Sequence, residues 1–264
     1  MADVLEVWRG EGRHEITLNR PGRRNAINRE LNAEIVAALR AFDADADARV
    51  AVLTGADPAF CAGMDLTDLG WADRSPGDRS PGDRGDTFAS ALRAVRKPVI
   101  AAVNGPAITG GFELALGADF ILASERAFFG DTHARVGVFP GGGMTVYLAQ
   151  AVGVRRARQL SYTGELIDAA EALRLGLANE VLPHDDLLPR AREVAAAVAA
   201  VDASLLTELR VAYQRRGNLG TDDALAAERA ESARRRGSAE GIAARRDEVI
   251  TRGHRRIQRE EQGS

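Results

Sequence analysis

The chain has 264 residues, enough to bury a sizeable core in one large domain or in a domain with an appendage. Hydrophobic residues make up 45% and charged residues 28%, as in a globular protein, and no apolar run approaches the roughly 20 residues that cross a bilayer. The net charge of -3 argues against a general nucleic-acid binder, and acidic residues, among them Glu231 and Glu240, flank the basic stretch at residues 234–236.

The location of the protein is predicted from its cysteine content and its first residues. Cys61 is the only cysteine, so no internal disulfide can form. The start of the chain is acidic and lacks the basic and apolar blocks of a secretory signal. We therefore expect a cytoplasmic protein that neither spans a membrane nor binds nucleic acid.

The first half of the chain alternates strand-like and helix-like patterns. Residues 4–8 and 15–18 alternate like half-buried strands, with Gly10 and Gly12 between them. Apolar residues recur at helical spacing from Leu31 to Phe42. Three later segments are short and apolar, as buried strands are: residues 50–53, 99–103 and 120–122. Strands separated by helices predict an α/β fold with a parallel sheet.

Two later regions differ from this pattern. Residues 74–84 repeat the unit Arg-Ser-Pro-Gly-Asp, which has no apolar side chain, so we expect a surface loop. Ala-rich helical patterns cover residues 187–200, 204–215, 222–235 and 239–251. We therefore predict a core domain at residues 1–190 and a C-terminal helical region at residues 191–264. Such helices pack either on the core or on neighbouring subunits.

Two glycine turns follow predicted buried strands, one at residues 60–66 and the other at residues 104–116. Glycine lets the backbone approach a ligand closely, and free amides at a helix N-terminus favour an oxygen with negative charge. A pair of such donors stabilises an enolate or a tetrahedral oxyanion, at about 2.7–4 kcal/mol per donor. A single turn of this kind is commonplace, but two in order predict a site for a carbonyl oxygen. Neither matches the dinucleotide fingerprint or the P-loop.

Several motifs occur in an order and spacing that cover nearly the whole chain. They are residues 20–21, 25–27, 60–66, 97–105, 110–113, 139–142 and 238–242. Together they resemble the crotonase superfamily, whose best-known branch is enoyl-CoA hydratase/isomerase. The motifs are much more specific for the superfamily than for any one of its reactions.

The resemblance implies a crotonase spiral of ββα units followed by a helical trimerisation region, assembled as a homotrimer or a dimer of trimers. It implies a CoA thioester as substrate, a role in fatty acid metabolism, and no other cofactor. The amides of Met64 and Gly110 would form the oxyanion hole. The residues implied to line the substrate and CoA site are Arg24, Ala62, Asp65, Leu66, Thr67, Gly111 and Gly141. Lys97 is a further candidate for CoA phosphates.

The resemblance also assigns the acid and base positions. In the hydratase branch two glutamates share the handling of water and proton; Glu113 occupies the first position, and His133 stands at the second. Glu113 could act as base and then as acid while His133 holds water, since imidazole ordinarily changes protonation near neutral pH. The alternative is that His133 only lines the pocket. Asp131 could orient His133, but on an extended segment its reach would be moderate.

Three functions therefore remain open. The first is an enoyl-CoA hydratase, a lyase with Glu113 as acid/base and His133 assisting. The second is another crotonase reaction, namely double-bond isomerisation, thioester hydrolysis or decarboxylation. The third is an acyl-CoA-binding assembly protein with little turnover, which the missing second glutamate favours and the retained Glu113 opposes. Cys61 is expected to be a core residue, and the scattered histidines predict no metal site.

Overall fold

The strands of the first half follow the periodicity of the sequence. A computed structural model describes residues 3–68, 87–216, 219–234 and 246. Within these residues the strands are β1 (Leu5–Gly10), β2 (Arg13–Leu18), β3 (Val50–Gly55), β4 (Val99–Val103), β5 (Ala107–Ile108), β6 (Phe120–Ser124), β7 (Phe128–Gly130), β8 (Leu166–Asp168) and β9 (Glu180–Leu182). The predicted loop at 74–84, the motif at 238–242 and all but residue 246 of the last predicted helix lie outside the described residues.

Helices separate most of these strands, as predicted. The α-helices are α1 (Arg29–Ala44), α2 (Phe88–Ala94), α3 (Gly110–Leu116), α4 (Met144–Val152), α5 (Val154–Thr163), α6 (Ala169–Arg174), α7 (Leu187–Ala199), α8 (Ala203–Arg216) and α9 (Thr221–Arg234). The short 3-10 helices are η1 (Pro21–Arg23), η3 (Ala134–Val136) and η4 (His184–Asp186). Among the described residues, none of the helices is both long and apolar enough to cross a bilayer.

Two sheets organise the strands. The larger has the order β1-β2-β3-β4-β6-β9, in which β1 and β2 form an antiparallel hairpin and all later neighbours are parallel. The smaller has the order β5-β7-β8. The chain alternates between the two sheets. After β4 in the larger sheet it forms β5 in the smaller sheet and then the helix α3. The same order recurs with β6 in the larger sheet, β7 in the smaller sheet and the helix α4. These successive ββα units confirm the predicted spiral.

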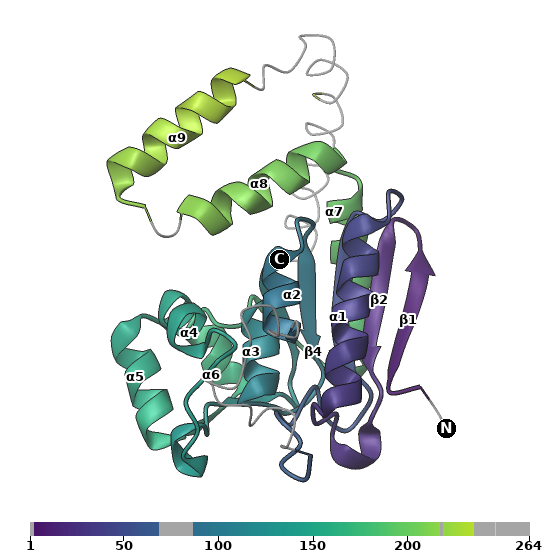
Figure 1. Cartoon of the computed structure of the whole chain (residues 1–264), viewed down its shortest axis with the longest axis vertical. Helices are drawn as coiled ribbons and strands as arrows, with labels where there is room; N and C mark the ends of the chain where they lie inside the picture. The colour runs from purple at the N-terminus through teal and green to yellow at the C-terminus, as the bar shows by residue number, and fades with distance from the viewer. Residues whose placement is uncertain (1–2, 69–86, 217–218, 235–245, 247–264) are drawn as a thin grey trace, which may run out of the picture. The chain divides into compact units, whose positions relative to one another are not determined.

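The larger sheet is buried on both faces. Ala51 and Leu53 of β3 belong to the main core with α1, whose predicted apolar residues from Leu31 to Phe42 are all buried. Val50 and Val52 point to the other face, where they pack with α7. Figure 1 shows α1 and α2 side by side in front of the sheet, with α7 behind it. The hydrophobic pattern of β3 is continuous because both of its faces are covered.

The chain forms two compact units, residues 1–210 and 211–264. The first unit includes α7, which extends beyond the predicted core limit at residue 190. It ends at Arg210, whose guanidinium donates to Asp119 Oδ2 at 2.8 Å and to the carbonyl of Val95. In the second unit, α9 buries none of its residues. The predicted role of the C-terminal helices in trimerisation stays a prediction.

Candidate active site

The two glycine turns lie directly against each other. Cys61 donates its amide to Pro106 O at 3.0 Å, and Ile108 donates to Cys61 O at 3.0 Å. Gly111 packs so closely on this carbonyl that a Cβ there would lie 2.1 Å from Cys61 O. Turns that are more than forty residues apart in sequence therefore form one backbone surface.

Two backbone amides on this surface are adjacent. Ile27 N donates to Gly63 O at 2.7 Å and Asp65 N donates to Ile27 O at 2.9 Å, which turns the N–H of the intervening Met64 away from Ile27. Gly110 is the first residue of α3, and a Cβ placed on it would lie 3.7 Å from Met64 N. Among the described residues, neither amide has a backbone acceptor. The pair is thus the candidate donor pair for one oxygen.

Thr109 holds the second turn in a strained conformation. Its φ of 46° and ψ of -113° are unusual for a β-branched residue, and such a conformation costs about 1–3 kcal/mol. Thr109 N donates to Gly130 O at 2.9 Å, and Gly63 packs on Thr109 Oγ1, where a Cβ would approach to 2.1 Å. These contacts fix the direction of the next amide, that of Gly110.

Glu113 is buried within α3, and the two oxygens of its carboxylate have different surroundings. Oε1 accepts the amides of Gly142 at 2.7 Å and Met144 at 3.2 Å. Oε2 lies 3.7 Å from His133 Nε2. The backbone amides where the glycine turn at 141–143 meets α4 therefore bind Glu113. Oε1 is thus engaged by backbone donors, and Oε2 is the oxygen that faces His133.

Gly142 is expected to be essential for this arrangement. A Cβ on Gly142 would lie 2.6 Å from Glu113 Oε2, whereas a Cβ on Gly141 meets nothing within 4 Å. We expect Gly142→Ala to displace the carboxylate of Glu113, the predicted acid/base, and to lower kcat by about tenfold or more. Steady-state kinetics and thermal unfolding test this, with Gly141→Ala as the control for an unchanged melting temperature. Equal kcat for Gly142→Ala and wild type would contradict it.

His133 is paired with Asp131 more closely than sequence reasoning predicted. The Nδ1 atom of His133 lies 2.7 Å from Asp131 Oδ1, which also accepts the amide of His133 at 3.2 Å. The expected extended segment is wrong: after β7 the chain turns, and His133 is the N-cap of η3, with helical φ and ψ of -53° and -49°. That turn brings residues i and i+2 together. Both side chains are buried.

The carboxyl of Asp131 is held in its ionised form. Burial alone would raise its pKa, but hydrogen bonds from His133 and Ser161 outweigh burial and lower the pKa below the usual value of an aspartic acid. A lowered pKa in the folded state stabilises the protein above the unfolded value, and this contribution is lost as pH falls through the folded value. We expect the melting temperature to fall below about pH 4, and to fall less steeply in Asp131→Asn. Parallel curves for the two proteins would contradict this prediction.

The remaining predicted substrate residues surround the first turn. Arg24 is exposed, and its carbonyl accepts the amide of Ala62 at 3.0 Å. Leu66 and Thr67 are exposed as well. The Asp65 carboxylate is buried and engaged inside the chain, by Arg20 Nη1 at 3.0 Å and Thr67 Oγ1 at 2.7 Å, so it anchors the turn.

The predicted role of Lys97 toward CoA phosphates stays a prediction. Lys97 is partly exposed, but its ammonium is engaged within the chain. Its Nζ donates to the carbonyls of Phe42, at 3.0 Å, and of Asp45 at the end of α1. Carbonyls at a helix C-terminus attract a cation, so this lysine stabilises α1.

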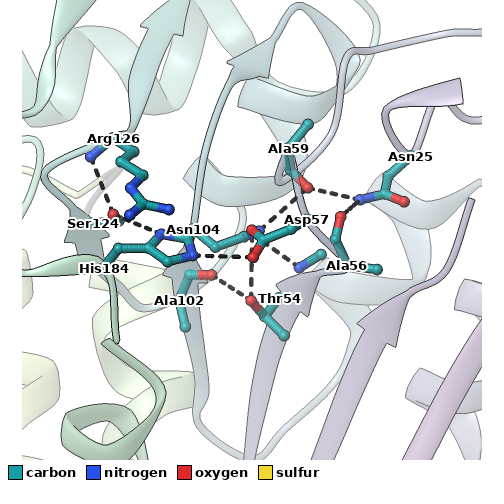
Figure 2. A network of polar contacts seen from close by, with 11 residues as sticks. Asn25, Thr54, Ala56, Asp57, Ala59, Ala102, Asn104, Ser124, Arg126 and His184 are labelled. Atoms are coloured by element: carbon teal, nitrogen blue, oxygen red, sulfur yellow. Dashed lines mark hydrogen bonds and ion pairs between the residues drawn. The ribbon is translucent and has the colours of Figure 1, made fainter. Parts of the chain in front are cut away.

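A polar network supports the loop that precedes the first turn. Figure 2 shows Asp57 between Asn104 and His184, at 2.9 and 3.0 Å. The other ring nitrogen of His184 lies 3.1 Å from Ser124 Oγ. These residue types also make up hydrolytic triads, but Ser124 is fully buried and its oxygen accepts the amide of Arg126. The network therefore positions backbone and offers substrate no nucleophile.

Cys61 is not a nucleophile either. Its side chain is fully buried, and burial raises the pKa of the thiol to about 12. Within the described ranges, no group of three or more His, Cys, Asp and Glu side chains is placed to hold a metal ion. The candidate chemical groups of the site are the backbone amides of Met64 and Gly110, the Glu113 carboxylate and the Asp131–His133 pair.

Sequence reasoning missed several residues of the site. Gly142 belongs to the motif at 139–142, but its hydrogen bond to Glu113 was not predicted, since the two residues are 29 positions apart. Ser161 lies on α5 and gave no signal at all. Asn25 was part of a motif, but its role was not predicted. Its buried side-chain Nδ2 donates to Ala56 O at 2.8 Å and to Ala59 O at 2.7 Å, which fixes the loop before Cys61.

Comparison with known proteins identifies the family of this site. The sequence profile of the enoyl-CoA hydratase/isomerase family matches residues 9–237. The chain belongs to the enoyl-CoA hydratase/isomerase family. It is 40% identical over 205 residues to a probable enoyl-CoA hydratase of Mycobacterium bovis, covering 76% of this chain and 77% of that protein. A probable enoyl-CoA hydratase of Rhizobium meliloti is 45% identical over 186 residues, which cover 70% of this chain and 71% of the relative.

Solved structures of the family have the same fold. The crystal structure of an enoyl-CoA hydratase from Mycobacterium tuberculosis matches with a TM-score of 0.70 at 45% identity, over 81% of this chain and 88% of that one. That of an enoyl-CoA hydratase/isomerase from Mycobacterium abscessus, described as putative, matches with a TM-score of 0.82 at 28% identity, over 94% and 96%. The crotonase fold and membership of an enzyme family thus agree with the predictions.

Proposed function

We propose that the protein adds water to the double bond of a 2-enoyl-CoA thioester and releases a 3-hydroxyacyl-CoA. The observation that carries this proposal is the juxtaposition of Glu113 Oε2 and His133 Nε2, 3.7 Å apart. Two proton-transfer atoms facing each other suit a reaction that must take one proton from water and give one to carbon. The names of the relatives support the same reaction.

The amides of Met64 and Gly110 are the proposed oxyanion hole. When water attacks Cβ, electrons move through the double bond onto the thioester oxygen, which becomes an enolate. Two backbone N–H groups aimed at that oxygen stabilise the charge by about 2.7–4 kcal/mol each. Because Thr109 and Gly63 fix both turns, the donors need little reorganisation during the reaction.

Glu113 and His133 then divide the proton transfers. As the bond from water oxygen to Cβ forms, an O–H bond of water breaks and its proton passes to His133 Nε2. Glu113 Oε2 gives its proton to Cα when the enolate collapses. The imidazolium of His133 returns a proton to Glu113, which restores both groups. In this cycle the CoA thioester is the substrate, and the proton transfers use only side chains of the chain itself.

Hydration of crotonyl-CoA by the purified protein tests the proposal. Addition of water removes the conjugation of the double bond with the thioester, so the absorbance of the conjugated system falls. We expect turnover that depends on enzyme concentration and yields a 3-hydroxyacyl-CoA. Conversion of the same substrate to free CoA, to a shifted double bond or to no product would contradict the proposal and favour hydrolysis, isomerisation or a binding role.

We also propose a contact with CoA, an oligomeric state and a location for this enzyme. The exposed guanidinium of Arg24, beside the Ala62 turn, is suited to bind a CoA phosphate. A homotrimer or a dimer of trimers in the cytoplasm is proposed from the family resemblance, and the unburied surface of α9 is consistent with contacts to other subunits. Light scattering of the full chain measures the oligomeric state.

A further inference from the structure

We propose that Asp131 is a positioning residue that keeps the proton of neutral His133 on Nδ1, so that Asp131 and His133 act as a single base toward water. The inference rests on the proposed hydration for its kinetic consequences. The tautomer of His133 is a property of the folded protein and does not depend on the reaction.

The hydrogen bonds of Asp131 decide which nitrogen of His133 carries the proton. An ionised carboxylate can only accept hydrogen bonds. Asp131 Oδ1 lies 2.7 Å from Nδ1 of His133, so Nδ1 is the donor. In a neutral imidazole the other nitrogen then has a lone pair, and this nitrogen, Nε2, is the one that faces Glu113 Oε2.

Asp131 is itself firmly held. Its side chain is 1% exposed, and Oδ1 accepts the backbone amide of His133 at 3.2 Å as well as the ring nitrogen. Ser161 reaches it from α5 with a further hydrogen bond. Because these hydrogen bonds fix Asp131, its contact with Nδ1 also fixes the orientation of the His133 ring.

Other Asp–His pairs in the described part of the chain lack this arrangement. His14 Nε2 lies 2.7 Å from Asp45 Oδ2, but its Nδ1 is buried without a hydrogen-bond partner. His184 joins Asp57 to the hydroxyl of Ser124. Of these three histidines, only His133 has one nitrogen on a carboxylate and the other facing a second carboxyl group. The two contacts of His133 therefore suit proton transfer, and they do more than supply a buried ring with hydrogen-bond partners.

The kinetic test is Asp131→Asn with Asp45→Asn as the matched control. Both changes remove the charge of a carboxylate that lies 2.7 Å from a histidine nitrogen. We expect kcat for crotonyl-CoA hydration to fall about 100-fold in Asp131→Asn, with little change in KM, and to stay within twofold of wild type in Asp45→Asn. In a His133→Gln background, Asp131→Asn should have no further effect, because Asp131 acts through His133. A wild-type kcat in Asp131→Asn, or a full additional loss in the double variant, would overturn the proposal.

The second test needs no variant of Asp131 and no activity. ¹⁵N NMR of the wild-type protein reports which ring nitrogen of each histidine is protonated, and the signals of His133 are those that disappear in His133→Gln. We expect a protonated Nδ1 and an unprotonated Nε2 in the neutral ring. A neutral ring with its proton on Nε2 overturns the proposal even if the enzyme hydrates enoyl-CoA. The expected tautomer in a protein that hydrates no enoyl-CoA leaves the positioning role of Asp131 standing and contradicts only the proposed function.

Discussion

Replacing Glu113 by glutamine is expected to lower kcat for crotonyl-CoA hydration by about a thousandfold, within the range for loss of a general acid/base. Glutamine keeps the shape of the side chain, and its carbonyl oxygen can still accept the amides of Gly142 and Met144. Its NH₂ group then stands where Oε2 faced His133 and cannot exchange a proton. Because binding is preserved, KM should change little. Steady-state kinetics and a thermal melt measure both consequences.

The matched control for this variant is Glu125→Gln, which makes the same chemical change on an exposed side chain at the end of β6. It should keep the kcat and the melting temperature of wild type. If Glu113→Gln retained more than about a tenth of the wild-type kcat, far above the loss expected for an acid/base group, Glu113 would not be the principal proton-transfer group.

Gly111→Ala is expected to have the largest effect on folding. The added methyl group would lie 2.1 Å from Cys61 O and 2.7 Å from the carbonyl carbon of Cys61, both of which are backbone atoms that cannot move without opening the turn. Overpacking of this kind costs about 1–3 kcal/mol or more, which is a large part of the stability of a domain. We expect a clear drop in the melting temperature or an insoluble protein, together with the loss of hydration activity.

Gly110→Ala gives the informative contrast. A Cβ on Gly110 would lie at ordinary contact distances, 3.6 Å from Met64 Sδ and 3.7 Å from Met64 N, so the fold should be kept. The methyl group would stand beside the two proposed oxyanion donors and crowd the thioester oxygen. We therefore expect a near-wild-type melting temperature with a kcat about tenfold or more lower, from impaired donation to the oxyanion. Equal destabilisation of the two variants would contradict the close packing of Gly111 on the first turn.

The strands β1 to β4 and β6, the helix α1 and the C-terminal helices were predictable from the sequence, because local patterns determine them, whereas the short strands β5, β7, β8 and β9 were not predicted. β3 and β4 are short apolar runs, and α1 has a single apolar stripe whose members are all buried. The two glycine turns were recognised from their place after buried strands. The contact between the two turns could not be read from either turn alone. It depends on the parallel bridge between Cys61 and Ala107, which are far apart in the sequence.

The contacts that define the chemistry could not be predicted in the same way. His133 was recognised because it stands where the hydratase branch has its second glutamate. Its short contact with Asp131 was not predicted, because it depends on a turn after β7 where an extended segment was expected. The hydrogen bond from Ser161 and the packing of Gly142 on Glu113 join residues about thirty positions apart. Such contacts follow from tertiary packing, on which local periodicity carries no information.

The most direct test of the proposed hydration is the fate of the oxygen of water. Purified wild-type protein is incubated with crotonyl-CoA in H₂¹⁸O, and the product is analysed by mass spectrometry with fragmentation. We predict one ¹⁸O atom at C3 of an intact 3-hydroxyacyl-CoA, formed rapidly by wild type and about a thousandfold more slowly by Glu113→Gln. Label in a free carboxylate with release of CoA, or an unlabelled product, would contradict hydration by this site.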